Sequence, residues 1–243
     1  MLGGSAKPGR RLSPELVALC ERFESEEGPE PGLVYFTDED YRAAAAQLLD
    51  QAGDDPLWVF AYGSLLWRPA FEVEDARFAH ASGWRRDFCM EIRRWRGSPH
   101  QPGLMMALRR GTGTCLGKVM QIKHSDRRAQ LVRLLKREVD TAEDLLSLRW
   151  IEADTDEGKV RALACWAEPT KSRMFVEKFI EEQAYMLARA CGSSGSGAAY
   201  LHRTVTSLTE FGLEDPYLTM LDELVSKEIA ARTGFDASSL SAR

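Results

Sequence analysis

One acidic side chain lies in a segment, residues 125–139, whose sequence predicts an amphipathic helix. Ser125 supplies a cap, and apolar side chains recur after it at helical spacing. Glu138 falls on the same predicted face as Leu131 and Leu135, because residues three, four or seven apart share one face of a helix. A carboxylate on an inward face loses hydration, which raises its pKa and suits proton transfer near neutral pH. The spacing makes Glu138 the candidate general acid or base.

Two alternatives stand beside this interpretation. A glutamate near a helix end commonly turns outward, and here it would pair with a neighbouring arginine such as Arg137. Glu91 is a second acidic candidate, in a predicted strand where it shares a face with Asp87 and Cys89. We expect that face to be the more solvated one, so Glu138 is preferred.

A short apolar run, residues 57–62, stops abruptly at Gly63 and Ser64. This pattern predicts a buried strand that ends in a turn. Glycine permits a sharp turn, and the next backbone N–H groups can converge on a carboxylate or a developing oxyanion. Taken alone, the residues from Tyr62 to Leu65 are more typical of a strand that simply ends, so the turn by itself is a weak indication of a site.

The elements that would position these residues alternate between helical and strand patterns. Helices are predicted from Ser13, from Thr37 to about Ala52, from Ser125 to about Val139, from Lys171 to about Cys191, from Ala198 to Phe211 and from Pro216 to Thr233. Strands are predicted at 57–62, 85–92, 104–110, 115–122 and 160–167. The break at 111–114 predicts a hairpin between the third and fourth of these strands, and residues 192–197 predict a flexible surface loop.

Together these elements predict an α+β fold, in which helices pack outside a sheet or barrel. Residues 1–56 are interpreted as an N-terminal helical extension, 57–235 as the main domain and 236–243 as a C-terminal tail. The sequence leaves the oligomeric state open.

Composition argues against several classes of function. The 243 residues carry a net charge of −5, which removes the simplest electrostatic case for a nucleic-acid partner. The five cysteines form no Cys-x-x-Cys pair and the four histidines show no ligand spacing, so we expect neither a metal site nor a disulfide framework. The polar start and the lack of a long apolar stretch predict a cytoplasmic protein without a membrane partner.

The sequence contains several ordered motifs, which are Trp58 to Pro69, Gly83 to Phe88, Arg96 to Ser98 with Pro102 to Leu104, Arg137-Glu138, and Tyr200-Leu201 with Thr204 to Asp215. In this order, the motifs resemble the ChaC family of γ-glutamylcyclotransferases. The resemblance runs from about Leu57 to about Leu218. It implies a small mixed β-barrel flanked by helices, no cofactor, and a small-molecule substrate, glutathione or a related γ-glutamyl peptide.

The resemblance also implies roles for individual residues. The family's catalytic glutamate matches Glu138, in agreement with the helical spacing. Arg96 and Tyr200 lie in matched motifs and are secondary candidates. The family's substrate-binding segment matches Phe60, Ala61, Tyr62, Gly63, Ser64 and Leu65.

The implied reaction converts the γ-glutamyl group of glutathione into 5-oxoproline and releases cysteinylglycine. The substrate's own amine attacks its γ-carbonyl carbon, so the enzyme supplies proton transfer instead of a nucleophile. Two alternatives remain open, a cyclotransferase for another γ-glutamyl amide and a non-catalytic binding or regulatory protein on the same fold. An aromatic residue that commonly follows the family's Arg-Glu pair is absent from residues 139–145, which leaves the choice of substrate open.

Overall fold

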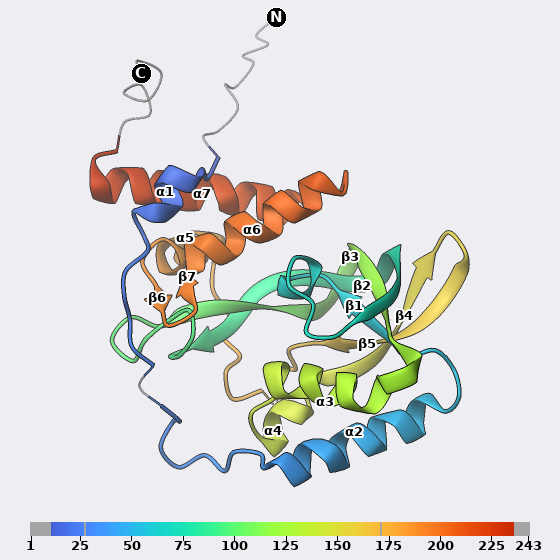
Figure 1. Ribbon diagram of the computed structural model, residues 1–243. Coiled ribbons are helices and arrows are strands. Elements are labelled where there is room, and N and C mark those ends of the chain that lie inside the picture. Colours follow the sequence, from blue (N-terminus) through green and yellow to red (C-terminus); the bar gives the residue numbers. More distant parts are fainter. Residues whose placement is uncertain (1–10, 27, 171, 236–243) are drawn as a thin grey trace, which may run out of the picture. The chain divides into compact units, whose positions relative to one another are not determined.

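The computed structural model describes residues 11–26, 28–170 and 172–235. In this part of the chain the residues form two compact units (Figure 1). One, the barrel unit, takes in Gly28–Met90 and Met106–Val176. The other, the helical unit, takes in the described residues within Met1–Glu27, Glu91–Met105 and Glu177–Arg243.

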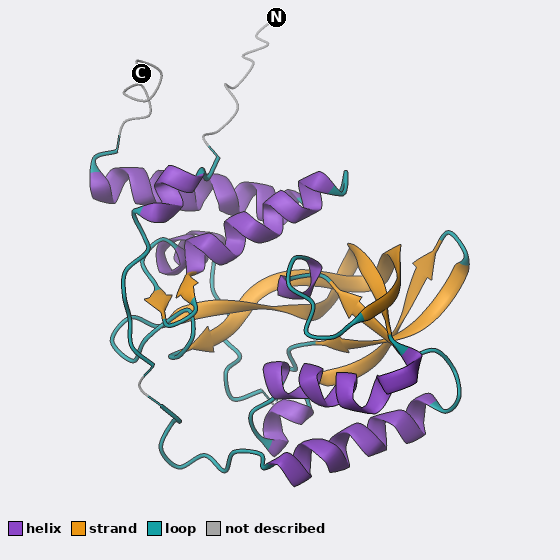
Figure 2. Cartoon of the chain, viewed as in Figure 1, coloured by secondary structure: helices purple, strands orange, loops and turns teal. Residues whose placement is uncertain are grey.

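Five strands close into a barrel (Figure 2). They are β1 (Trp58–Ala61), β2 (Val73–Ile92), β3 (Gly103–Ile122), β4 (Leu148–Thr155) and β5 (Gly158–Cys165), in the order β1-β3-β2-β4-β5. β4 and β5 form an antiparallel hairpin, and β1 is parallel to β5, so the barrel is mixed. Closure pairs the strand edges that an open sheet would expose. The predicted α+β fold with a mixed barrel is confirmed.

β1 is the shortest barrel strand and is buried along its whole length. β3 pairs with it on one side, with Ala61 opposite Lys118, and β5 pairs on the other, with Val59 opposite Leu163. Burial on both faces explains why the strand reads as a continuous apolar run. These two neighbours fix the end of β1, where Tyr62 begins the turn.

Helices α2 (Asp38–Ala52), α3 (Arg127–Glu138) and α4 (Ala142–Leu145) belong to the barrel unit, as do the 3₁₀ turns η1 (Ser64–Leu66) and η2 (His124–Asp126). Thr37 caps α2 and Thr141 caps α4, each in a capping box with an aspartate three positions later. α3 lies beside α2 (Figure 1). Its buried positions fix its rotation about its own axis and therefore set the direction of Glu138; they are Gln130, Leu131, Leu134 and Leu135.

The helical unit contains α1 (Pro14–Ala18), α5 (Ile180–Leu187), α6 (Gly197–Glu210) and α7 (Pro216–Thr233), with the short strands β6 (Cys191–Gly192) and β7 (Gly195–Ser196). α1 and α5 both pack against α6 and α7. Gly212 and Gly234 have left-handed φ angles of 69° and 67°, the conformation typical of glycines that follow the last turn of a helix, here α6 and α7. The apolar core includes Leu16, Leu187, Leu201, Leu221, Val225 and Ile229.

The predicted hairpin at 111–114 is wrong, because β3 runs without interruption from Gly103 to Ile122. Gly113 has a φ of 117°, so a glycine bends this long strand instead of reversing the chain. β2 likewise begins at Val73, well before the predicted start at Arg85. Both strands are long because they pair with each other around the barrel.

The predicted helix at 171–191 is wrong in its first half, since α5 begins only at Ile180. Val176 instead donates its N–H to the carbonyl of Cys89 at 2.9 Å, so backbone pairing with β2 replaces helical bonding there. The predicted flexible loop at 192–197 is also wrong. Gly192 and Ser196 are buried in the β6–β7 hairpin.

The predicted division into 1–56, 57–235 and 236–243 stays a prediction. Contacts divide the described part of the first segment between the two units, with residues 11–26 in the helical unit and the residues from Gly28 onward in the barrel unit. Residues 1–10, 27, 171 and 236–243 lie outside the described residues. Among the described helices, none has the length and apolar character needed to cross a bilayer.

Candidate active site

Glu138 is the last residue of α3, and its side chain keeps only 18% of its surface exposed. Its Oε1 atom is buried and accepts no hydrogen bond from the described residues. The expected alternative, outward rotation toward an arginine, is wrong in part. Glu138 does pair with Arg137, at 3.2 Å between Oε1 and Nε, but it stays largely out of solvent.

Arg137 connects this carboxylate to the turn after β1. Its Nη2 atom donates to Ser64 Oγ at 2.7 Å, and its Nη1 atom donates to the carbonyl of Arg68. The planar guanidinium offers several donors in a rigid arrangement, so one side chain can serve three partners at once. Arg137 therefore fixes the turn and the carboxylate with respect to each other.

The turn from Tyr62 to Leu65 leads from β1 into η1. Gly63 has φ −134° and ψ −127°, a conformation that is neither helical nor extended. Leu66 closes the turn by donating its N–H to the carbonyl of Gly63 at 3.0 Å. Within the described residues, no hydrogen bond of a turn or loop starts from the N–H of Gly63, Ser64 or Leu65. These are the donors that the sequence predicts for an anionic group.

Cys165, at the end of β5, contacts both halves of the site. Its Sγ atom lies 4.0 Å from Glu138 Oε2, and its carbonyl accepts a hydrogen bond from the Tyr62 hydroxyl at 2.7 Å. The Phe60 ring stacks on the Tyr62 ring, with 6.2 Å between centroids. The predicted residues of β1 and its turn thus meet the predicted glutamate through Cys165 as well as through Arg137.

Arg86 supports the turn from β2. Its side chain is buried, Nε donates to the carbonyl of Tyr62 at 2.7 Å, and Nη2 donates to the carbonyl of Leu116. Sequence reasoning missed this residue, although Arg86 alternates in phase with Phe88 and Met90, which are apolar and buried. The alternation of side chains between the two faces of β2 could therefore have indicated that Arg86 points inward.

The electrostatics of this cluster separate its two titratable groups. Burial raises the pKa of Glu138, and the neighbouring Arg137 cation opposes that rise. Burial raises the pKa of Cys165 well above its ordinary value, and the Glu138 charge adds to the effect. Cys165 is therefore a neutral thiol at neutral pH, and Glu138 is the group of this pair that can exchange a proton.

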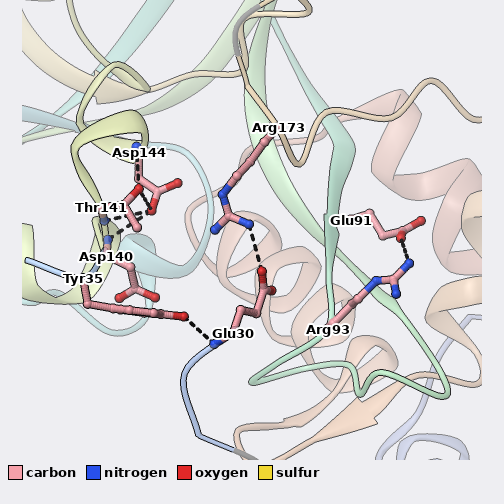
Figure 3. Close-up of polar contacts among 8 residues, drawn as sticks. All are labelled: Glu30, Tyr35, Glu91, Arg93, Asp140, Thr141, Asp144 and Arg173. Atoms are coloured by element: carbon pink, nitrogen blue, oxygen red, sulfur yellow. Dashed lines mark hydrogen bonds and ion pairs between the residues drawn. The ribbon is translucent and has the colours of Figure 1, made fainter. Parts of the chain in front are cut away.

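Glu91, the rejected acidic candidate, belongs to the helical unit and pairs with Arg93 at 3.3 Å (Figure 3). The expectation that its strand face is solvated is wrong for its neighbours, because Asp87 and Cys89 are both buried. Asp87 is compensated by Arg109, which donates to it at 2.8 Å. Both faces of β2 are covered here, so the alternation of side chains along the strand does not separate a solvent-exposed face from a buried one.

Arg96 and Tyr200, the secondary candidates, lie together in the helical unit. The Arg96 guanidinium sits 5.1 Å from the centre of the Tyr200 ring, and its Nη1 atom donates to the carbonyl of Ser196 at 3.1 Å. Their role in substrate binding stays a prediction.

Relatives of known function match most of the chain. The glutathione-specific γ-glutamylcyclotransferase of Escherichia coli K12 is 31% identical over 202 residues, which cover 83% of this chain and 86% of that protein. The human glutathione-specific γ-glutamylcyclotransferase 1 is 30% identical over 162 residues, 65% of this chain and 73% of the relative.

A solved structure and a family model complete the comparison. The crystal structure of a yeast γ-glutamyl cyclotransferase specific to glutathione aligns with a TM-score of 0.65 and 19% identity, over 72% of this chain and 97% of that chain. At this identity the likeness concerns the fold, which is that of the γ-glutamylcyclotransferases as predicted. A family model described as a ChaC-like protein matches residues 57–228. With that match over more than half of its length, the chain belongs to the ChaC family.

Proposed function

We propose that this protein cleaves glutathione to 5-oxoproline and cysteinylglycine, with Glu138 as the general base and acid. The chain is an enzyme of the γ-glutamylcyclotransferase type by its family. The names of the bacterial and human relatives, both glutathione-specific, support glutathione as the substrate.

The observation that carries the proposal is the shared guanidinium of Arg137. It contacts Glu138 Oε1 and Ser64 Oγ, so a largely desolvated carboxylate and the turn after β1 form one arrangement. A γ-glutamyl group needs both parts. The turn would hold its polar atoms, and the carboxylate would handle its proton.

The reaction follows from the chemistry of these groups. Glu138, as a carboxylate, accepts a proton from the substrate's α-ammonium group, which frees the amine to attack the γ-carbonyl carbon. The new C–N bond closes the five-membered ring. When the C–N bond to the cysteine nitrogen breaks, Glu138 returns its proton to that departing nitrogen. The ring nitrogen then loses its second ammonium proton to the regenerated Glu138 carboxylate, which passes it to the released cysteinylglycine amine. Protons and electron pairs therefore balance, and no external nucleophile is required.

The turn would stabilise the charge that develops during the attack. N–H groups at Gly63, Ser64 and Leu65 are suited to the oxyanion of the tetrahedral intermediate, and such donors commonly contribute a factor of about 100–1,000 in rate. Holding the γ-glutamyl group folded back on itself brings amine and carbonyl into contact before the reaction begins.

Glu138→Gln tests the proposal. The amide keeps the shape of the side chain but accepts no proton, so release of 5-oxoproline and cysteinylglycine from glutathione should fall by at least about 100-fold. Circular dichroism shows whether the variant is folded. Turnover near the wild-type rate by a folded variant would remove Glu138 from the proposed role.

Glu91→Gln is the matched control, since it makes the same chemical change at the acidic candidate that pairs with Arg93. We expect its turnover to stay within a factor of about two of the wild type. A panel of other γ-glutamyl amides, assayed in parallel for 5-oxoproline, measures the preference for glutathione. Faster release from another member of the panel would contradict the proposed substrate.

A further inference from the structure

The backbone that follows Glu138 is held by a segment that precedes the family match. The Tyr41 hydroxyl, on α2, donates to the carbonyl of Val139 at 2.8 Å. Phe36 donates its N–H to the carbonyl of Asp140, also at 2.8 Å. Two consecutive carbonyls after Glu138 therefore receive their hydrogen bonds from residues outside 57–228.

The position of these two carbonyls explains why such partners matter. Carbonyl groups at the end of an α-helix have no partner within the helix, and helix ends fray when nothing else binds them. Glu138 is the terminal residue of α3, so fraying would move its side chain directly. Val139 already leaves the helical conformation, with φ −137° and ψ 123°.

The side chain of Tyr41 is held in the position from which it donates to Val139. This side chain is buried, and its ring packs edge-on against the Phe36 ring with centroids 5.3 Å apart. Burial raises the pKa of the Tyr41 hydroxyl, and the nearby carboxylates of Asp140, Asp144 and Asp38 raise it further. The hydroxyl consequently remains a hydrogen-bond donor across the neutral range.

A second set of contacts holds the same segment in place. Tyr35 pairs with Thr141 through an antiparallel bridge, and its hydroxyl accepts a hydrogen bond from the N–H of Glu30 at 2.7 Å (Figure 3). The Glu30 carboxylate pairs with Arg173 at 2.9 Å, as Figure 3 also shows. Asp144 accepts from the N–H and the hydroxyl of Thr141 at 3.0 and 2.9 Å. The turn after Glu138 is thus bound from both sides.

We infer that Tyr41 is a positioning residue for Glu138, and that α2 belongs to the catalytic architecture of this enzyme although it lies outside the family match. The inference rests on the proposed function of Glu138. Among the described residues, the Tyr41 hydroxyl donates to Val139 and not to the Glu138 carboxylate. It acts through Val139, and it keeps the carboxylate within reach of Arg137 and the turn.

Tyr41→Phe removes the hydroxyl and keeps the ring that packs on Phe36. We expect kcat for glutathione to fall by about 3- to 10-fold, the effect of losing one hydrogen bond, with KM changed by less than about twofold. In the Glu138→Gln background the same substitution should cause no further loss, because Tyr41 acts only through that carboxylate. A full additional loss in this background would overturn the inference.

Ala43→Gly is the control for a purely structural effect. Position 43 is exposed on the same helix, and glycine there lowers the helix propensity of α2 without changing the contact to Val139. We expect it to lower the melting temperature as Tyr41→Phe does but to leave kcat within about twofold. Equal losses of kcat in both variants would show that Tyr41 contributes stability alone.

A measurement that needs no turnover separates this inference from the proposed function. The measurement is an NMR titration of protein labelled with carbon-13 at its glutamate carboxyl groups. The Glu138 signal is the one that Glu138→Gln removes, and spectra recorded over a range of pH give its titration midpoint. Arg137 and Cys165 face this carboxylate, while Lys136, Asp38, Asp140 and Asp144 surround Tyr41.

We expect Tyr41→Phe to broaden the Glu138 signal or shift its titration midpoint, and Ala43→Gly to leave it unchanged. An identical signal and midpoint in Tyr41→Phe would overturn the inference. If the wild type released no 5-oxoproline from any γ-glutamyl compound, the proposed function would fail, and this titration would still decide whether Tyr41 positions Glu138.

Discussion

At Glu138, two electrostatic effects oppose each other. Burial raises the pKa of the carboxyl group, and the Arg137 cation lowers it. A general base must be unprotonated at the working pH and must still bind a proton during the reaction, so the balance between the two effects matters for catalysis. Because Arg137 also binds Ser64, one side chain influences both the charge of the proposed base and the position of the turn.

Arg137→Gln removes the cation that lowers the pKa of Glu138, so that pKa should rise. The proposed mechanism requires the base form of Glu138, and the acid limb of the plot of kcat/KM against pH should therefore move to higher pH. Loss of hydrogen bonds from a charged group, about 1.5–3 kcal/mol, should also reduce kcat/KM by roughly 10- to 100-fold. Assays of glutathione turnover across a range of pH give both quantities.

Arg133→Gln is the control for this change, since Arg133 is an exposed arginine of the same helix that contacts Gln130. For Arg133→Gln, the acid limb of the plot of kcat/KM against pH should match that of the wild type. An acid limb in Arg137→Gln that coincides with the wild-type limb would contradict the assigned interaction.

Sequence reasoning identified Glu138 because helical spacing is a local property. The partners of Arg137 are not local, since Ser64 lies 73 residues earlier in the chain. Cys165 gave no signal either, because its contact with Glu138 exists only once β5 has closed the barrel beside β1. The candidate base could be predicted, whereas the residues around it depended on long-range packing.

Among the elements, β3 passes unusually close to the end of β1 at Gly117. A Cβ atom at this position would lie 2.4 Å from the carbonyl of Ala61 and 3.0 Å from the Phe60 ring. Real side chains do not tolerate such contacts with backbone, so glycine permits the approach. The approach occurs one residue before the turn at Tyr62.

Gly117→Ala should therefore push β1 and β3 apart. We expect a loss of about 1–3 kcal/mol in the free energy of unfolding, as for other overpacked sites, and a fall in glutathione turnover because the turn shifts. Thermal melting and a turnover assay measure the two effects.

Gly111→Ala, in the same strand, provides a comparison. Its Cβ would meet only the flexible Arg85 side chain, at 3.2 Å, so stability should change by no more than about 0.5 kcal/mol. Equal melting temperatures for Gly117→Ala and the wild type would show that the strands can separate without cost.

Elements with strong local signals were predicted and others were not. α2, α6 and α7 carry caps at their starts, and the structure places these helices close to the predicted limits. The segment before α5 has helical composition but pairs its backbone with Cys89, a partner that local propensity does not reveal. The glycines of β3 predict a reversal of the chain, because a bent strand and a hairpin have the same local composition.

At the scale of the whole molecule, the N-terminal segment is joined to the last helix by a buried acid. Asp222, on α7, accepts a hydrogen bond from the N–H of Leu12 at 3.1 Å, while its Oδ1 atom is buried and accepts none from the described residues. Burial raises the pKa of Asp222 to about 6.

This pKa makes the stability of the fold depend on pH. The folded-state value of about 6 lies above the value of about 3.9 expected for an unfolded chain, so the folded protein binds the proton more tightly. Stability from this group is present at acid pH and is lost as the pH rises through 6. Two pKa units correspond to about 3 kcal/mol at most.

Asp222→Asn should remove this dependence while keeping an acceptor for Leu12. We expect the variant to be more stable than the wild type above pH 6, with the difference shrinking toward acid pH. Urea unfolding at several pH values measures it. Glu210→Gln, at an exposed position, should reproduce the wild-type profile, and an unchanged profile in Asp222→Asn would contradict the assignment.

The parallel pairing of β1 with β5 has a consequence for how the protein is made. Val59 lies opposite Leu163, 104 positions later in the chain. At a synthesis rate of about 5–20 residues per second, β1 leaves the ribosome roughly 5–20 seconds before its partner exists. During that interval the apolar strand β1 lacks its neighbour β5, so its exposed side chains can bind chaperones or aggregate. The turn at Tyr62 is therefore completed late, after most of the barrel unit has been translated.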